Sequence, residues 1–196
     1  METNEVIKKI EHLLVDIWEN GLKMDFENHG FMWERHFQAV FYFRLRNVLF
    51  SLFGDEIGVW IEPVFNIQKQ QVKPDIVITY SSFIVSVIEL KFKAWEPVVY
   101  EGDITKLNDL IDFKNQAIPL SVKKLKANWN EQKLHGNLRT YTIADNCLPV
   151  FAVVGRDGSD ALKMTSYQKK DHLKGLLWLI GFIQSGDNEV IFKKLP

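Results

Sequence analysis

Apolar residues recur at a helical spacing in the first quarter of the chain. Between residues 5 and 20 they are Val6, Ile7, Ile10, Leu13, Leu14, Ile17 and Trp18. Between residues 31 and 53 they include Trp33, Phe37, Phe41, Leu45, Val48 and Leu52. These patterns predict an amphipathic helix over 5–20 that ends at Gly21, and a longer one over 31–53 that ends at Gly54. The second is so apolar that we expect it to lie against a sheet.

Three stretches rich in β-branched and aromatic residues follow the second helix. They predict strands over residues 58–67, 72–80 and 83–92, separated by polar or serine-containing turns. The last two stretches do not alternate cleanly between apolar and polar residues. This lack of alternation indicates strands that are covered on both faces.

The remainder of the chain continues the mixture of helices and strands. We expect a helix from Asp103 or Thr105 to about residue 115, a strand over 149–154, a helix over 171–183 and an edge strand over 189–192. The order of elements predicts an α/β fold, a mixed β-sheet flanked by helices on both sides. At 196 residues the chain fits one domain, 1–196, with a core of about 31–155.

Composition excludes several classes of protein. The formal net charge is −1, so the chain is not a polycation that binds nucleic acid by total charge. The longest apolar run, residues 175–183, is shorter than the roughly 20 residues of a membrane span. The polar N-terminal residues do not resemble a secretory signal, so we expect a cytoplasmic protein. The single cysteine, Cys147, excludes an intrachain disulfide, and we interpret it as a core residue.

Charged residues interrupt the two buried strands at Pro74-Asp75 and at Glu89-Leu90-Lys91. Carboxylates and an ammonium group in apolar strands cost free energy unless a cation or a phosphate compensates them. If Asp75 faces Glu89 across a hairpin, the strands are joined by a three-residue loop, Ser81-Ser82-Phe83. Glu89 and Lys91 then share one face of the sheet with Asp75.

This pattern favours a site for a hard divalent cation. Magnesium or manganese takes oxygen ligands, often one or two carboxylates with water and substrate phosphate, and Asp75 and Glu89 meet that demand. The carbonyl of Leu90 is a further candidate ligand. Such a metal lowers the pKa of water, and Lys91 would position the water and stabilise charge on the phosphate.

Pro74-Asp75 and Glu89-Leu90-Lys91, together with the order of helices and strands around them, resemble the PD-(D/E)XK nuclease superfamily over about residues 31–155. The resemblance implies a restriction-endonuclease-like αβββαβ core, Mg²⁺ or Mn²⁺ as cofactor, and cleavage of DNA in bacterial defence or DNA processing. It also implies that Glu34, at the start of the preceding helix, belongs to the catalytic site and holds the metal together with Asp75 and Glu89. Gln38, one turn on, shares its face. A homodimer would allow both DNA strands to be cut.

Alternatives remain for each of these residues. The same chain contains a second E-x-K triplet, Glu131-Gln132-Lys133, by chance. Glu89 and Lys91 would also suit an exposed edge strand that discourages sheet extension, and Glu34 would favour the dipole of its helix. Rival functions are a catalytically inactive module of the same fold that binds nucleic acid or protein, and a nuclease that acts on RNA.

Two further features bear on substrate and metal. Residues 121–139 form the most basic stretch, with Trp129 and His135 among the lysines, and are either a phosphate-binding insertion or a solvated helix face. The five histidines show no paired spacing, so we do not expect a catalytic zinc. They are His12, His29, His36, His135 and His172.

Overall fold

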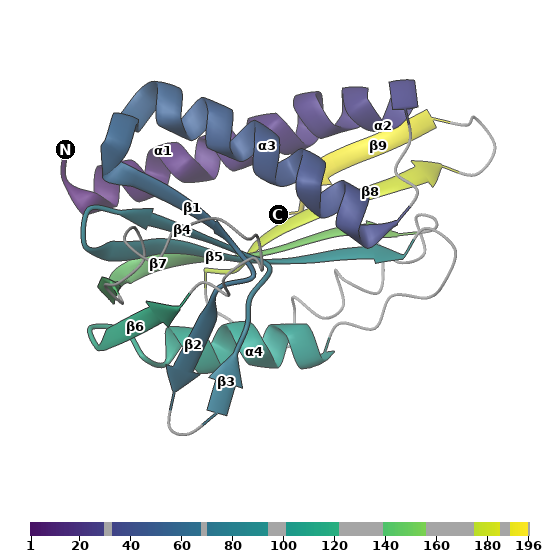
Figure 1. The fold of residues 1–196 in the computed structure, drawn as a ribbon. Helices are drawn as coiled ribbons and strands as arrows, with labels where there is room; N and C mark the ends of the chain where they lie inside the picture. The colour runs from purple at the N-terminus through teal and green to yellow at the C-terminus, as the bar shows by residue number, and fades with distance from the viewer. Residues whose placement is uncertain are drawn as a thin grey trace, which may run out of the picture.

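A computed structural model describes residues 1–29, 33–67, 70–93, 101–121, 139–155, 175–184 and 189–195. In these residues the chain has an α/β fold, with a mixed, mostly antiparallel sheet flanked by helices (Figure 1). The strands are β1 Ile57–Ile61, β2 Val64–Ile67, β3 Gln70–Val72, β4 Ile76–Tyr80, β5 Phe83–Lys93, β6 Ala117–Ser121, β7 Arg139–Gly155, β8 Leu177–Gln184 and β9 Glu189–Lys194.

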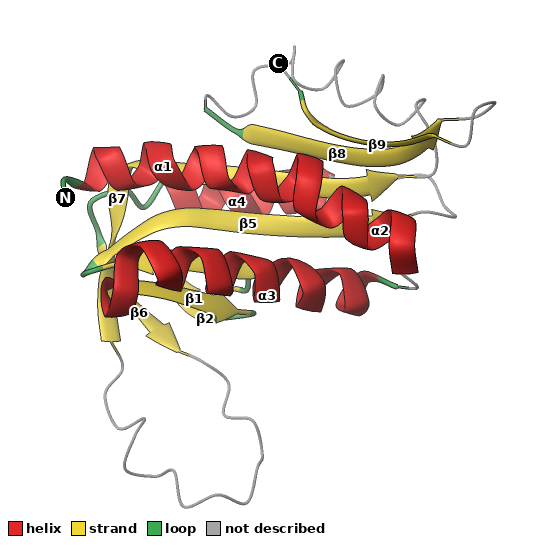
Figure 2. Cartoon of the chain, turned by 90° about the horizontal axis from the view of Figure 1, so that it is seen from above, coloured by secondary structure: helices red, strands yellow, loops and turns green. Residues whose placement is uncertain are grey.

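The strand order is β1-β4-β5-β7-β6-β2-β3, and β8 pairs with β7 and with β9. The β5–β7 and β7–β8 pairs are parallel, whereas the other pairs among the described strands are antiparallel. Helices α1 (Thr3–Asp16), α2 (Lys23–His29) and α3 (Glu34–Phe53) lie over one face, and α4 (Glu101–Ile111) lies on the other (Figures 1 and 2). The predicted mixed sheet with helices on both sides is confirmed.

The N-terminal helix is longer than the hydrophobic pattern predicts. Beyond Asp16 the chain makes a π-helical segment, Ile17–Leu22, and runs on into α2 without a break. The prediction that Gly21 ends the helix is therefore wrong. A Cβ at Gly21 would lie 3.1 Å from the guanidinium group of Arg44, which pairs with Asp25. The glycine serves helix packing and is not a stop.

Trp18 anchors these helices to the sheet. Its side chain is fully buried and donates a hydrogen bond to the Ile180 carbonyl in β8, 3.0 Å away. The rings of Phe37 and Phe41 in α3 and of Phe192 in β9 pack around it at centroid distances of 5.0 to 6.0 Å. Helix α3, Glu34–Phe53, corresponds to the helix predicted over 31–53. It lies against the sheet, as predicted, and it ends at Gly54, whose φ is +60°.

The predicted strands over 58–67 and 72–80 are each divided in the structure. Glu62, with φ of +46°, and Pro63 separate β1 from β2, and Pro74-Asp75 separates β3 from β4. Because of these divisions, β2 and β3 leave the β1–β4 ladder. They pair with each other, and β2 also pairs with β6. All five residues of β4 are buried, and β5 is buried over Ile84–Leu90, so both strands are covered on two faces as expected.

The predicted helix over 171–183 is wrong. Residues 177–184 form strand β8, which pairs in parallel with the C-terminal half of β7, while residues 156–174 lie outside the described part of the chain. A short, continuously apolar run suits a buried strand and a buried helix equally well, and pairing with β7 decides between them. The strand predicted over 189–192 is confirmed as part of β9.

The chain between residues 115 and 149 contains strand structure that the pattern does not reveal. Proline lacks the amide that a strand ladder uses, yet Pro119 lies in β6 and pairs with Thr140 of β7. The predicted strand over 149–154 is the C-terminal part of the longer β7, whose register against β5 shifts between Ile143 and Leu148. Residues 122–138, most of the basic stretch, are outside the described residues.

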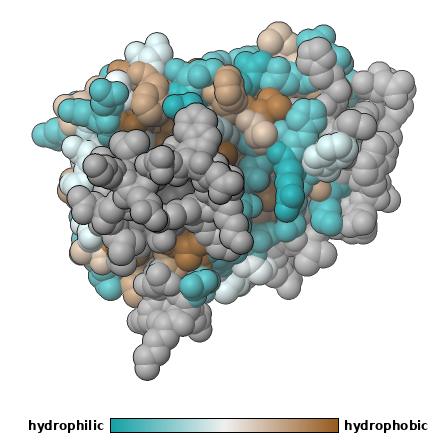
Figure 3. Space-filling view, viewed as in Figure 1, coloured by the Kyte–Doolittle hydropathy of each residue, from teal (hydrophilic) through white to brown (hydrophobic). Residues whose placement is uncertain are grey.

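The surface and the remaining sequence features agree with a folded core. The face of the molecule in Figure 3 is mostly hydrophilic, with hydrophobic groups exposed in small patches. Cys147 is buried, and burial raises the pKa of its thiol to about 12, as suits a core residue. None of the helices in the described residues is long and apolar enough to cross a membrane.

Candidate active site

The hairpin of β4 and β5 brings Asp75 opposite Glu89, although not by the predicted turn. Tyr80 pairs with Phe83, so the turn holds two residues, Ser81 and Ser82, and the predicted three-residue loop is wrong. A register shift next to Ile78 and Thr79 then changes the pairing to Ile76 with Ile88. If this register continues by one residue, Asp75 lies opposite Glu89. The register shift is a β-bulge, and its extra residue makes up for the residue that is absent from the turn. The predicted alignment of Asp75 with Glu89 is therefore kept.

Two carboxylates accept hydrogen bonds from backbone amides of β5, beyond the point where the pairing of β5 with β4 ends. The Asp75 carboxylate accepts a hydrogen bond from the Leu90 amide at 2.7 Å, and the Glu34 carboxylate accepts one from the Phe92 amide at 3.2 Å. Both amides lack a β4 partner because the ladder ends at the pair Ile76–Ile88. Glu34, the first residue of α3, thus lies at the same strand edge as Asp75, and its role at a metal stays a prediction.

Glu89 is the buried centre of the cluster. Its exposed fraction is 1%, and one carboxylate oxygen, Oε2, forms an ion pair of 2.8 Å with the ammonium group of Lys106 in α4. The other oxygen, Oε1, is buried and has no hydrogen-bond partner in the structure. An unpaired buried carboxylate oxygen is costly, so this atom has capacity for a further donor or cation.

Lys91 points to the same side of the sheet as Glu89, as the period of two predicts. Its ammonium group lies 3.0 Å from the Asp103 carboxylate in α4, and Asp103 also lies 3.6 Å from Lys106. Burial lowers the pKa of Lys91, but the hydrogen bond and charge of Asp103 outweigh it and raise the pKa overall. Lys91 therefore remains a cation held in a fixed position.

The cluster carries more negative than positive charge. Four carboxyl groups, those of Glu34, Asp75, Glu89 and Asp103, surround two ammonium groups, those of Lys91 and Lys106. With Glu89 protonated the sum is −1, and a divalent cation that displaces this proton meets a sum of −2, the charge that it neutralises.

The pKa values of the two central carboxyl groups reflect this excess. Burial and then the charge of Asp75 raise the pKa of Glu89 to about 9, although Lys106 opposes the shift. Burial also raises the pKa of Asp75, against the lowering effects of the Leu90 amide and of Lys106. Both shifts show that the two lysines do not fully compensate the buried negative charge.

The oxygens present fit a site for Mg²⁺ or Mn²⁺ with few protein ligands. Asp75 and Glu89 provide two carboxylates, and the Leu90 carbonyl points to the same strand edge as its amide. Magnesium is commonly held by one or two carboxylates, with water and phosphate as further ligands. Within the described residues, no group of three or more His, Cys, Asp or Glu side chains is arranged to hold a metal ion. Glu34 lies beside this site, where its carboxylate accepts the hydrogen bond from the Phe92 amide.

Two residues of the cluster were missed from the sequence, and a third has an unexpected contact. Asp103 was predicted as a possible helix cap, but it is the third residue of α4, and Lys106 was not singled out. Their spacing of three on a helix was the available signal, because it places both on one helix face. Gln38, predicted to share the face of Glu34, donates a hydrogen bond of 3.4 Å to the Asp75 carbonyl.

The raised pKa of Glu89 predicts how stability depends on pH. The folded protein keeps the Glu89 proton up to about pH 9, whereas in the unfolded chain the carboxyl group has its ordinary pKa of 4.5. Between these values the folded state binds more protons, so the free energy of unfolding falls as pH rises. We expect Tm in metal-free buffer to fall by several degrees more for the parent protein than for Glu89→Gln across this range.

The control for this measurement is Asp109→Asn, which removes an exposed carboxylate from the same helix as Lys106. It should follow the parent profile. Parallel profiles for the parent and for Glu89→Gln would show that Glu89 does not keep its proton in the folded state.

Comparison of the chain with protein-family models, with curated proteins and with solved structures finds no match. The function must therefore be inferred from the residues and their geometry.

Proposed function

We propose that this chain is a metal-dependent phosphodiesterase that hydrolyses DNA, with a restriction-endonuclease-like fold of the PD-(D/E)XK type. The observation that carries the proposal is the buried carboxyl cluster, with its excess of negative charge and the unpartnered Oε1 of Glu89. The order of α3, β1, β4, β5, α4 and β7 supports the proposal because it matches the αβββαβ order that the resemblance implies, with β2, β3 and β6 inserted between these elements. A role in bacterial defence or DNA processing rests on the resemblance.

In this proposal Asp75 and Glu89 bind Mg²⁺ or Mn²⁺ together with the Leu90 carbonyl, and Glu34 holds the adjoining strand edge. The bound cation supplies positive charge that makes water more acidic and the phosphate more electrophilic. Lys91 orients the attacking water and donates a hydrogen bond to a phosphate oxygen that gains charge in the transition state. Asp103 is a positioning residue, because its ion pair fixes the ammonium group of Lys91.

A second candidate function is an inactive module of the same type that binds nucleic acid or protein. The observation that favours it is the ion pair between Lys106 and Glu89, in which an ammonium group already neutralises part of the buried charge. An ammonium group in the place of a metal ion would stabilise the fold but would not support phosphodiester hydrolysis.

Cleavage assays in Mg²⁺ test the proposed function and separate it from its rivals. We expect the parent protein to cleave duplex or single-stranded DNA, and Asp75→Asn to lower the rate at least about a hundredfold. Asp109→Asn is the matched control and should retain the parent rate.

The substrate that is cleaved decides among the candidate functions. Cleavage of structured RNA but not of DNA would leave the chemistry in place and change the substrate. Failure to cleave all three substrates, with Mn²⁺ unbound, would favour the inactive module.

A further inference from the structure

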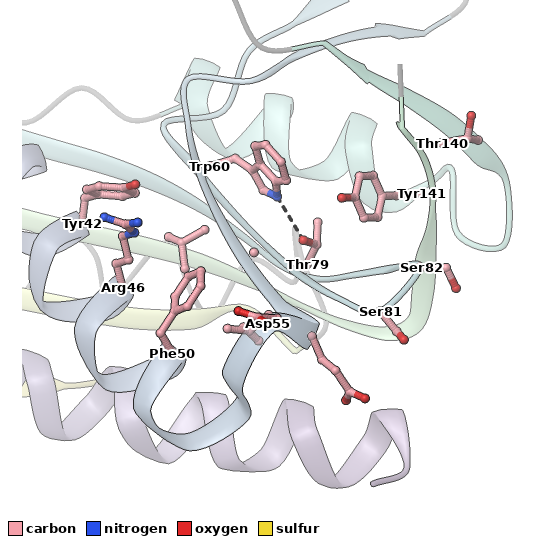
Figure 4. A pocket seen from close by; sticks show the side chains of 14 residues that line it. Tyr42, Arg46, Phe50, Asp55, Trp60, Thr79, Ser81, Ser82, Thr140 and Tyr141 are labelled. Atoms are coloured by element: carbon pink, nitrogen blue, oxygen red, sulfur yellow. Dashed lines mark hydrogen bonds between the residues drawn. The ribbon is translucent and has the colours of Figure 1, made fainter. Parts of the chain in front are cut away.

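A hollow of about 800 Å³ lies away from the carboxyl cluster, along strand β1 (Figure 4). Its lining includes four consecutive residues of this strand, Ile57 to Trp60. Successive residues of a strand point to opposite faces, so four in a row can line one hollow only if it follows the edge of the strand. Residues of α3 contribute as well, among them Arg46 and Phe50.

The hydrogen bonds on either side of β1 reveal which backbone groups face this edge. The Glu62 amide donates to the Asp75 carbonyl, and the Ser81 amide donates to the Glu56 carbonyl. In an antiparallel ladder the bonded positions recur every second residue, so the even-numbered residues from 56 to 62 face β4. The amides and carbonyls of Ile57, Val59 and Ile61 therefore point outward, and among the described strands β1 pairs with β4 only.

The side chains leave this edge open. Trp60 turns toward β4, where its indole Nε1 donates a hydrogen bond of 3.0 Å to the Thr79 hydroxyl (Figure 4). Gly58 makes this possible, since a Cβ there would lie 2.8 Å from the same indole nitrogen and 2.5 Å from the Thr79 hydroxyl oxygen. The indole thus packs over the glycine and away from the outward-facing amides.

Strand β1 also lacks the features that usually protect an edge. Its sequence, Ile-Gly-Val-Trp-Ile, contains no charged residue and no proline. By contrast, the edge strand β9 carries Lys193 and Lys194, and the Lys194 amide is bonded to Glu19 of the π-helical segment. In the described part of the chain, charges lie only at the two ends of the strand, at Glu56 and Glu62, so its apolar centre is open to pairing with another strand.

The edge of β1 is complementary to itself. Antiparallel pairing of two copies about Val59 would set Val59 against Val59 and Ile57 against Ile61 of the second copy. Each copy then uses all three outward amides and all three outward carbonyls, so no backbone group at the edge stays unpaired. A twofold arrangement of this kind forms a closed dimer.

The same register sets Glu56 against Glu62 of the second copy, a repulsive pair that is reduced because Lys73 already forms an ion pair with Glu62. The other charges along the hollow favour the pairing. Arg46 lies on α3, one turn before Phe50, and its guanidinium group stacks over the Phe50 ring at 5.4 Å from the centroid. Asp55 follows the end of α3. Antiparallel pairing reverses the two ends of the hollow between copies. It therefore brings Arg46 of each copy toward the end that holds Asp55 of the other, a favourable arrangement of opposite charges.

We propose that β1 of one copy pairs with β1 of a second copy, so that the chain forms a homodimer through a sheet continuous across both. The proposal does not depend on the proposed nuclease function, because none of the residues at this edge belongs to the carboxyl cluster.

Val59→Pro tests the dimer directly. Proline removes the outward amide at the centre of the interface but no hydrogen bond to β4, and proline is tolerated where a strand amide faces away from its neighbour. Sedimentation analysis should give twice the chain mass of 22.9 kDa for the parent. For Val59→Pro we expect the dissociation constant to rise at least about tenfold.

Two further variants keep the test decisive. Val59→Ala shortens the side chain and keeps the amide, so it should still dimerise. Arg46→Asp should weaken the dimer, and the double variant Arg46→Asp/Asp55→Arg should restore it. This second test does not depend on whether the proline variant folds. A parent protein that stays monomeric at all concentrations, or a dimer that persists unchanged in both Val59→Pro and Arg46→Asp, would overturn the proposal.

Discussion

Replacing Lys91 by methionine is expected to lower the rate of phosphodiester cleavage by about 10²- to 10³-fold while divalent cation binding is retained. The ammonium group of Lys91 lies on the face of the sheet that carries Glu89 and is fixed by Asp103 at 3.0 Å. In the proposed function it donates to a phosphate oxygen whose charge grows in the transition state. Methionine keeps the length and apolar stem of the side chain but cannot donate, so the loss should appear in kcat more than in KM.

The matched control is Lys114→Met, which removes an exposed lysine just beyond the end of α4. It should cleave at the parent rate. Calorimetric titration with Mn²⁺ should give similar affinities for the parent and for Lys91→Met, because Lys91 is not a ligand. A Lys91→Met protein that cleaves as fast as the parent would remove Lys91 from the chemistry.

The sequence predicts the strand geometry around Asp75, Glu89 and Lys91 because a few local rules determine it. The strand period of two places Glu89 and Lys91 on one face, and both contact α4 in the structure. The alignment of Asp75 with Glu89 was predicted from a three-residue loop, whereas the structure uses a shorter turn and a bulge. The two solutions give the same register, so the correct alignment was reached from an incorrect turn.

Long-range packing accounts for what the sequence does not reveal. Strand β8 was predicted as a helix because the run from Leu177 to Ile183 is apolar throughout, and only its parallel pairing with β7 identifies it as a strand. Gly21 was predicted to end a helix, but its role depends on Arg44, 23 positions later in the sequence. In each case the deciding partner is distant along the chain, and local periodicity contains no information about it.

The same limit applies to the electrostatics of the site. Asp103 and Lys106 lie on a helix that the sequence predicts, yet nothing local shows that this helix packs beside β5. Their ion pairs determine the net charge around Glu89 and Lys91. They therefore determine how much negative charge remains for a bound cation to neutralise. The cluster is thus built from four residues that the sequence analysis identifies, Glu34, Asp75, Glu89 and Lys91, and two that tertiary packing adds, Asp103 and Lys106.

Calorimetric titration of the parent protein with Mn²⁺ tests the central claim most directly, because it examines the carboxyl cluster without requiring the substrate. Asp75 and Glu89 contribute the two carboxylates, and Oε1 of Glu89 is buried without a partner. We therefore expect the parent to bind one Mn²⁺ and both Asp75→Asn and Glu89→Gln to weaken binding at least about tenfold, or roughly 1.4 kcal/mol. Asp109→Asn should bind as the parent does. A parent protein that binds no Mn²⁺, or a Glu89→Gln protein that binds it as tightly as the parent, would contradict the assignment of this cluster as a metal site.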